Sequence, residues 1–326
     1  MDSFSFLLVA VILTALAFDF TNGFHDTANS MATSIATGAL SPRVAVAVAG
    51  VLNLAGAFLS TEVAKTISGG IVEDSQVSLV MIFAGLIGAI LWNLVTWLLG
   101  LPSSSSHALF GGLIGAVWVG AGGSAVRFGA IIEKIVIPAV ASPVVACVVA
   151  LLATYLAYVI TRRTARRAVG KGFRAGQIGS ASLVALAHGT NDAQKTMGVI
   201  TLALISTGAL SHGAGPPWWV VLNAGLAISL GTYAGGWRII RTMGKGLTDI
   251  QAPQGFAAET SATAVILASS HMGFPLSTTQ VCTGSILGAG LSRRLAHVRW
   301  RTGWTSTGAH SPGSSPSAWG SPPWWS

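Results

Sequence analysis

The stretch from Ile135 to Thr161 contains no charged residue. It is longer than the roughly 20 residues that an α-helix needs to cross a bilayer. Similar apolar stretches recur along the chain, and only 9% of all residues are charged, against about 25% in ordinary soluble domains. The strands of a membrane β-barrel would alternate in segments of about ten residues, which these stretches do not do. We therefore predict an all-α, polytopic integral membrane protein.

Several of the apolar segments are too short to span a membrane as simple helices. The candidate membrane segments are 4–18, 27–40, 44–61, 77–99, 103–121, 131–160, 178–210, 217–236, 256–273 and 276–291. The first follows Asp2 rather than a basic region, so we expect a retained helix and not a cleaved signal peptide. The segments 27–40, 103–121 and 276–291 are rich in Gly, Ser and Thr. Their composition favours half-helices or re-entrant hairpins.

The basic residues are concentrated between the apolar segments. The net charge is +8. One basic loop holds Arg162, Arg163, Arg166, Arg167, Lys171 and Arg174, and another holds Arg238, Arg241 and Lys245. The positive-inside rule places both loops in the cytoplasm, so the charge does not indicate a nucleic-acid partner. Cys147 and Cys282 lack the spacing of a disulfide or metal site and are expected to be packing residues.

The chain contains an internal repeat. Residues 102–116 align without gaps on 275–289, each segment starting at a proline and continuing into hydroxyl residues. Residues 23–29 align on 189–195 in the same order along the chain. Two motifs repeated in order indicate a duplication, and repeats with interrupted apolar segments are typical of transporters with a central site. The predicted units are a first transmembrane repeat (1–161), a basic cytoplasmic loop (162–177) and a second transmembrane repeat (178–300).

Two carboxylates, Asp26 and Asp192, occupy equivalent positions of the repeat inside apolar stretches. A charge at the centre of a membrane helix costs about 2.5–3.5 kcal/mol on insertion scales and is usually retained for function. The alternative is that each carboxylate caps a broken helix, which the repetition makes less attractive. Glu259 is a further candidate, whereas Glu62 is followed by Lys65 and is expected to form an interfacial ion pair.

The hydroxyl tracts Ser103–Ser106 and Ser277–Thr279 each follow a proline and precede a Gly-spaced apolar helix. The N–H groups at the start of such a helix bind oxyanions, and Ser or Thr hydroxyls add donors without fixed charge. The alternative is that small residues merely permit close helix packing in lipid. The matched prolines favour an oxyanion site for a phosphate or sulfate.

An anion beside the two carboxylates requires positive charge. A carboxylate and a monoanion about 6 Å apart repel by roughly 3 kcal/mol at an effective dielectric of about 20. Either Na⁺ or protonation of the aspartates would satisfy this need. Lys195 stands where the first repeat has Asn29, and its side chain either offsets part of the negative charge or snorkels to the interface. His25 and His107 lie in the same motifs. They serve either as proton-coupling groups or as packing residues.

These motifs resemble the inorganic phosphate transporter (PiT) family, whose hallmark is a duplicated Gly-x-Asn-Asp-type motif. It appears here at 22–29 and 188–195, with the two proline hairpins, and the resemblance covers residues 1–300. The resemblance implies an inverted-repeat helical bundle with broken helices and two re-entrant hairpins, and it implies a homodimer. It also implies transport of phosphate with H⁺ or Na⁺, sometimes as a neutral metal-phosphate complex.

The resemblance assigns residues of this chain to two roles. The cation-coupling residues would be Asp26, Asn29, Asn191, Asp192 and Glu259, and the phosphate-binding residues Ser103, Ser104, Ser105, Ser106, Ser277, Thr278, Thr279 and Gln280. The sequence departs from the family pattern at His25, where Asn is usual, and at Gln194-Lys195, where Ala-Asn is common. Both departures bear on the identity and number of the coupling cations.

The C-terminal segment also departs from the family pattern. The family continues into a further hydrophobic helix, so the second repeat is predicted to lack its last helix. Residues 301–326 form instead a low-complexity tail rich in Ser, Pro, Gly and Trp, for which disorder is the default expectation. The abrupt change is typical of a truncated or frameshifted gene end, which keeps an inactive family member as an alternative.

The sequence thus predicts a low-affinity phosphate symporter of the cytoplasmic membrane that works by alternating access. A sulfate permease on the same scaffold, a channel and a non-transporting sensor are the alternatives. An enzyme is not expected, because the chain has no P-loop and no Gly-x-Ser-x-Gly nucleophile elbow. No cofactor or resident metal is expected either.

Overall fold

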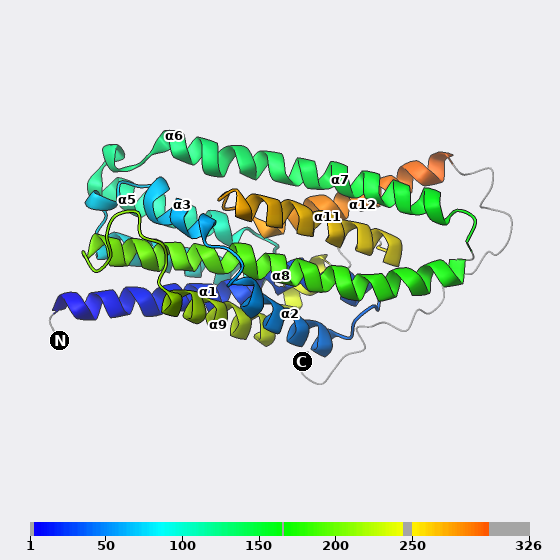
Figure 1. Cartoon of the computed structure of the whole chain (residues 1–326), viewed down its shortest axis with the longest axis horizontal. Coiled ribbons are helices and arrows are strands. Elements are labelled where there is room, and N and C mark those ends of the chain that lie inside the picture. The colour runs from blue at the N-terminus through cyan, green and yellow to red at the C-terminus, as the bar shows by residue number, and fades with distance from the viewer. Residues whose placement is uncertain (1–2, 165, 244–249, 300–326) are drawn as a thin grey trace.

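The computed structural model describes residues 3–164, 166–243 and 250–299, and within them the regular structure is helical. The α-helices are α1 (Ser3–Ala36), α2 (Pro42–Gly56), α3 (Glu62–Gly70), α4 (Leu79–Leu99), α5 (Ser105–Ala121), α6 (Phe128–Ile131), α7 (Ile137–Thr161), α8 (Arg166–Ser206), α9 (Trp218–Ala234), α10 (Trp237–Arg241), α11 (Ala252–His271) and α12 (Thr278–Arg299). Two 3₁₀ turns, η1 (Asp74–Gln76) and η2 (Gly123–Ala125), and a π-helical turn, η3 (Ile132–Val136), complete the order. The long helices lie roughly along one axis of the molecule (Figure 1). The predicted all-α class is confirmed.

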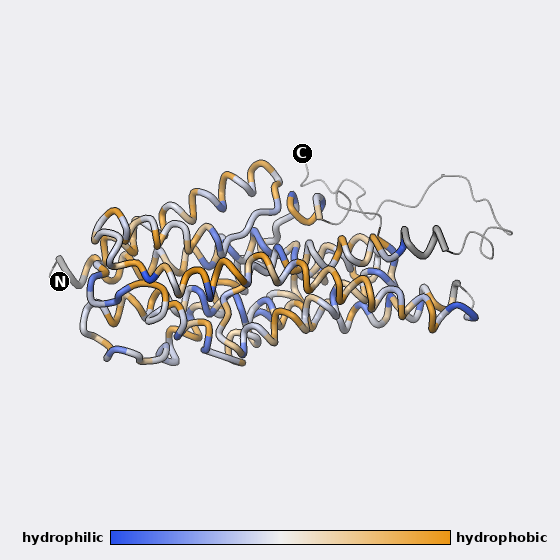
Figure 2. The backbone as a smooth tube through the Cα atoms, turned by 90° about the horizontal axis from the view of Figure 1, so that it is seen from above, coloured by the Kyte–Doolittle hydropathy of each residue, from blue (hydrophilic) through white to orange (hydrophobic). Residues whose placement is uncertain are grey.

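Within the part of the chain that the structure describes, three helical stretches are long and apolar enough to cross a membrane: Phe6–Ala36, Leu79–Leu99 and Phe128–Thr161. The last contains the predicted segment 131–160 and joins α6, η3 and α7. Large apolar side chains on α7 are exposed, Val140 to 66% and Ile160 to 70%, as expected for helices that face lipid rather than water. Figure 2 shows hydrophobic residues along most of the bundle and hydrophilic residues at its turns and in its middle part.

Two predicted interruptions are absent, and this corrects the sequence-based segments. α1 runs unbroken from Ser3 to Ala36, so it joins the predicted segments 4–18 and 27–40. α8 begins at Arg166, so most of the predicted basic loop 162–177 is helical. Neither helix contains a proline, the residue that most often breaks a helix. The repeated aspartates therefore lie in the middle of long helices, not at helix ends.

The two proline hairpins are present, and their two turns have the same sequence of features. α4 ends at Gly100 (φ 68°), and the α11–α12 turn has Gly273 (φ 73°), a left-handed conformation that favours glycine. In both turns the proline follows two residues later, and the N-cap serine of the next helix, Ser104 or Ser277, two residues after that. The hairpins approach from opposite ends of the bundle, α5 from one end and α11 and α12 from the other (Figure 1).

Glycines allow the helices of the bundle to pack with touching backbones. A Cβ atom at Gly23 of α1 would lie 2.4 Å from the carbonyl oxygen of Ile228 in α9, and one at Gly231 would lie 2.1 Å from that of Phe20. Small residues at helix interfaces permit this closeness in membrane proteins. This packing holds α1 rigidly along α9, which positions the central residues of α1.

The structure also bears on the peripheral predictions. Lys65 Nζ lies 2.8 Å from Glu62 Oε1, and both side chains are about half exposed. The predicted ion pair of these two residues is therefore confirmed. Lys245 and the predicted tail 301–326 lie outside the described residues.

Candidate functional site

The repeated aspartates are buried where the middle of α1 and of α8 meets the two hairpin tips. Asp26 is 2% exposed and Asp192 is not exposed at all. A hydrogen bond of 3.1 Å from Ser106 Oγ to the carbonyl oxygen of Leu276 joins the tips. The structure therefore brings together the predicted carboxylates and the predicted hydroxyl tracts, although they come from four separate parts of the chain.

Each carboxylate accepts a hydrogen bond from the equivalent hydroxyl of a hairpin. Ser105 Oγ donates to Asp26 Oδ2 over 2.7 Å. Thr278, which aligns with Ser105 in the repeat, donates to Asp192 Oδ2 over 3.2 Å. In addition Thr279 Oγ1 donates to Asp26 Oδ1 over 3.4 Å. The repeat seen in the sequence is thus preserved in the contacts of single atoms.

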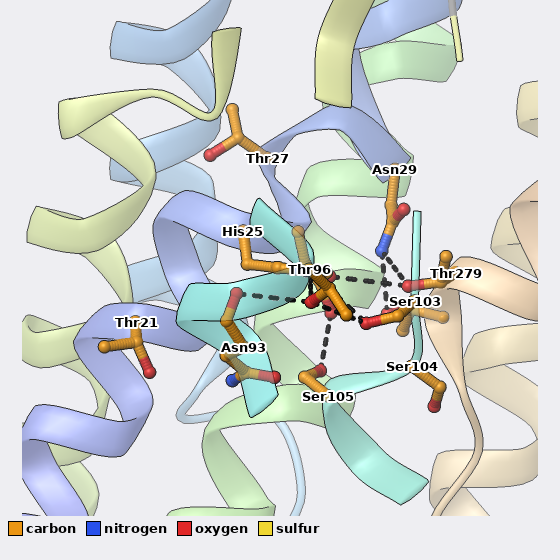
Figure 3. Close-up of polar contacts among 12 residues, drawn as sticks. Thr21, His25, Thr27, Asn29, Asn93, Thr96, Ser103, Ser104, Ser105 and Thr279 are labelled. Carbon is orange, nitrogen blue, oxygen red and sulfur yellow. Dashed lines mark hydrogen bonds and ion pairs between the residues drawn. The ribbon is translucent and has the colours of Figure 1, made fainter. Parts of the chain in front are cut away.

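The residues that precede the aspartates are matched as well. His25 Nδ1 lies 2.6 Å from Asp26 Oδ1, and Asn191 Nδ2 donates to Asp192 Oδ1 over 2.9 Å. The outer side of the His25 ring, Nε2, lies 3.1 Å from Thr96 Oγ1, as Figure 3 shows. In the first half a ring that can carry a proton therefore replaces a neutral amide.

The residues three positions after the aspartates reach to the opposite hairpin. Asn29 Nδ2 donates to Thr278 Oγ1 over 3.2 Å and to Thr279 Oγ1 over 3.0 Å. Figure 3 shows Asn29 pointing toward Thr279. Lys195 Nζ donates to Ser106 Oγ over 2.5 Å and forms an ion pair with Asp192 Oδ1. Lys195 is fully buried, so the snorkelling interpretation of Lys195 is wrong.

A cavity of about 520 Å³ opens beside the hairpin tips. Its lining residues are Gly88, Trp92, Ser103, Ser104, His107, Ala108, Gly111, Gly112 and Gln280. The structure therefore divides the predicted anion-binding residues. Ser105, Ser106, Thr278 and Thr279 are buried and bonded to the central side chains, whereas Ser103, Ser104 and Gln280 line the cavity. His107 Nδ1 lies 2.7 Å from Ser104 Oγ.

Glu259 lies in a separate buried cluster. Thr33 and Ser34 of α1 donate to Glu259 Oε1 over 2.5 and 2.6 Å. From α8, Gln177 Nε2 donates to the same oxygen over 3.1 Å, and Ser180 donates to Oε2. These bonds tie α1, α8 and α11 together. Glu259 is not brought into contact with the aspartate pair, with which sequence reasoning had grouped it.

Sequence reasoning missed two buried ionisable residues beside the site. His188 Nε2 lies 3.0 Å from Asp192 Oδ2, and ligand atoms of Asp26, His188 and Asp192 all lie within 4.8 Å of one another. Asp19 is also fully buried. His188 is one helical turn before Asp192 and Asp19 about two turns before Asp26. Their spacing of about one or two helical turns from the aspartates is therefore the sequence signal that could have identified both residues.

The arrangement combines buried carboxylates, hydroxyl-rich helix starts and an internal repeat. Known proteins have sequences similar to that of this chain. Residues 22–307 match the model of the phosphate transporter family. The chain belongs to this family. It is 60% identical over 296 residues to a probable low-affinity inorganic phosphate transporter of Mycobacterium bovis, covering 90% of this chain and 71% of that protein. A Bacillus subtilis protein of the same description is 42% identical over 304 residues, covering 93% and 91%.

A solved structure supports the assignment of this chain to the phosphate transporter family. It is described as the sodium-dependent phosphate transporter and superposes with a TM-score of 0.80 at 25% sequence identity. The match covers 90% of this chain and 91% of that one. The resemblance inferred from the motifs is therefore confirmed, and the described helices have the arrangement of a membrane transporter.

Proposed function

We propose that this chain transports inorganic phosphate across the cytoplasmic membrane by symport with H⁺ or Na⁺ through alternating access. The observation that carries the proposal is the meeting of two buried carboxylates with two hydroxyl-capped helix starts beside a cavity. Relatives described as inorganic phosphate transporters, and a structural neighbour described as sodium-dependent, support it.

The cavity provides donors suited to a tetrahedral oxyanion. Ser103, Ser104 and Gln280 line it, and α5 begins at Ser105 directly behind them. The first N–H groups of a helix have no partner within the helix and carry part of the positive end of its dipole. Phosphate would be held by these N–H groups and hydroxyls without a fixed cation, which suits a substrate that must be released again.

The aspartates provide the coupling. An anion in this cavity is repelled by Asp26 and Asp192, so a cation that neutralises a carboxylate favours binding of the anion. Asn29 Oδ1 is buried and has no hydrogen-bond partner, so it is free to act as an oxygen ligand beside the Asp26 carboxylate. Hard cations prefer such carboxylate and amide oxygens. A proton taken up by the Asp26–His25 pair would serve the same purpose.

The paired arrangement of the hairpins supports alternating access as the transport mechanism. The hairpin α4–α5 belongs to the first half and α11–α12 to the second, and their tips meet at the carboxylates. In transporters with inverted repeats, the motion of one half against the other exposes a central site to each side in turn. The contact between Ser106 and Leu276 is the one that such a motion would open.

Uptake of ³²P-phosphate into proteoliposomes tests this function. A Na⁺ gradient and a pH gradient are imposed separately, with and without Mg²⁺, and sulfate and arsenate serve as competitors. Accumulation that needs a gradient and is inhibited by arsenate but not by sulfate supports phosphate symport and names the cation. Competition by sulfate favours the sulfate permease, and unsaturable flux without accumulation favours a channel. A chain that binds phosphate without any flux contradicts the proposal.

A further inference from the structure

The two halves of the central site differ in one fixed charge. Asn29 Nδ2 donates to Thr279 Oγ1 over 3.0 Å, and Lys195 Nζ donates to Ser106 Oγ over 2.5 Å. Asn29 aligns with Lys195, and Thr279 with Ser106, in the internal repeat. The two donors therefore occupy equivalent places and contact equivalent acceptors, but one is a neutral amide and the other an ammonium group.

The ammonium group neutralises the carboxylate of its own half. Lys195 Nζ forms an ion pair with Asp192 Oδ1, and both side chains are fully buried. A lysine ammonium carries three donors and a compact charge, and Asp192 and Ser106 accept two of them. Because Nζ is bound covalently to α8, this positive charge cannot leave with the substrate.

Among the described residues, no such permanent partner contacts the carboxylate of the first half. Asp26 pairs with His25, whose positive charge depends on a proton taken from solution. Its other contacts are the hydroxyls of Ser105 and Thr279. The amide oxygen of Asn29 remains without a partner. The described groups that contact Asp26 therefore supply no fixed positive charge, so that neutralising its carboxylate depends on an exchangeable one.

We propose that Lys195 is a tethered cation in place of a transported one, so that the central aspartate pair binds a single exchangeable cation, at Asp26. This inference rests on the proposed cation symport and makes it more specific. A chain with asparagine at both positions would need two cations to neutralise both carboxylates before the anion binds. In this chain one of the two charges is supplied by the protein itself.

The number of cations that move with each phosphate measures this difference. At zero membrane potential, each further coupled cation multiplies the phosphate accumulation ratio by the cation gradient, so by about tenfold for a tenfold gradient. Lys195→Asn restores the pattern of the first half, and we expect one cation more per phosphate than in the unaltered chain. The reciprocal variant Asn29→Lys places a tethered ammonium beside Asp26. We expect it to move one cation fewer and to lose its response to the gradient.

Cation binding to the purified protein in detergent provides a count that needs no phosphate flux. Binding of ²²Na⁺ and proton uptake are measured for the unaltered chain and both variants. An additional bound cation in Lys195→Asn and one lost in Asn29→Lys support the proposal. An unchanged count in either folded variant overturns it, and assigns Lys195 a structural role only. Failure of the unaltered chain to accumulate phosphate would count against symport, whereas the binding count would still decide the role of Lys195.

Discussion

The hydroxyl of Ser106 lies 3.1 Å from the carbonyl oxygen of Leu276, and this hydrogen bond joins the tips of the two hairpins. The same hydroxyl accepts a hydrogen bond from the ammonium of Lys195. A single neutral hydrogen bond contributes only about 0.5–1.5 kcal/mol to stability. This one hydrogen bond between the hairpin tips is therefore weak enough to break and reform repeatedly.

Substitution of either central aspartate by asparagine is expected to abolish phosphate accumulation, but with different effects on stability. Asp192→Asn leaves the buried Lys195 ammonium without its ion-pair partner, and removing one partner of a buried ion pair typically costs about 3–5 kcal/mol. Asp26→Asn leaves His25, which can become neutral by losing its proton. We therefore expect a clearly lower Tm in detergent for Asp192→Asn than for Asp26→Asn.

A double variant serves as the control for this difference. Asp192→Asn combined with Lys195→Met removes both charges, so most of the lost stability should return. Both single variants and the double variant are compared by thermal unfolding and by ³²P-phosphate uptake. Equal Tm values for the two single variants, or near-normal accumulation in either of them, contradict the assigned roles of the aspartates.

Removal of the two capping hydroxyls is expected to weaken phosphate binding. Ser104 accepts a hydrogen bond from His107 N, and Ser277 accepts one from Gln280 N, so both fix the start of a helix that faces the site. We expect the double variant Ser104→Ala, Ser277→Ala to raise the half-saturation concentration for phosphate several-fold. The dependence of uptake on the cation concentration should stay unchanged. Initial uptake rates at varied phosphate concentration measure the effect.

The loss of a helix cap by itself costs about 1 kcal/mol, and a matched variant separates this effect. Ser78 caps α4 by accepting a hydrogen bond from Met81 N, and it does not line the cavity. Ser78→Ala should reduce stability by a similar amount and leave the half-saturation concentration as it was. If the double variant behaves like Ser78→Ala, the hydroxyl tracts are packing residues.

The Glu259 cluster is expected to respond to the loss of its acceptor oxygen. Donors from Thr33, Ser34, Gln177 and Ser180 converge on this carboxylate. Glu259→Gln replaces one acceptor oxygen by a donor, so buried hydroxyls lose their acceptor at about 1–3 kcal/mol each. We expect a lower Tm together with reduced uptake. Thr260→Val, next to it but exposed on α11, is the control, and equal Tm values for the two variants would refute this role.

The sequence predicted which residues meet at the candidate site better than it predicted the helices that carry them. The repeated aspartates and hydroxyl tracts were found because a duplication places each of them twice, and the prolines marked both hairpin turns. The lengths of α1 and α8 were not predicted. Their central polar residues resemble a break in an apolar pattern. In the structure the hairpin helices α5 and α12 supply partners for several of them, namely Asp26, Asn29, Asp192 and Lys195.

Other features depend on contacts that no local pattern records. The sequence gives Ser103 to Ser106 as one tract, but the turn of α5 directs Ser105 and Ser106 to Asp26 and Lys195 and leaves Ser103 at the cavity. The sequence also left two positions open for Lys195, one beside the aspartates and one at the interface, because a lysine near an apolar segment often snorkels. Its counterion, Asp192, is recognised as a partner only when both residues are placed on one helix, where side chains three positions apart are neighbours.

The close backbone contact between α7 and α12 is expected to tolerate no side chain at Gly288. A Cβ atom there would lie 2.0 Å from the carbonyl oxygen of Cys147, so Gly288→Ala must push the two helices apart, at a typical cost of about 1–3 kcal/mol for overpacking. Gly115 of α5 is the matched control, because no heavy atom lies within 4 Å of its added Cβ. Gly115→Ala should be neutral or stabilising by about 0.5–1 kcal/mol, since alanine restricts the unfolded chain. Thermal unfolding in detergent compares the two, and a Gly288→Ala protein as stable as the Gly115→Ala protein would show that α7 and α12 are not held in this contact.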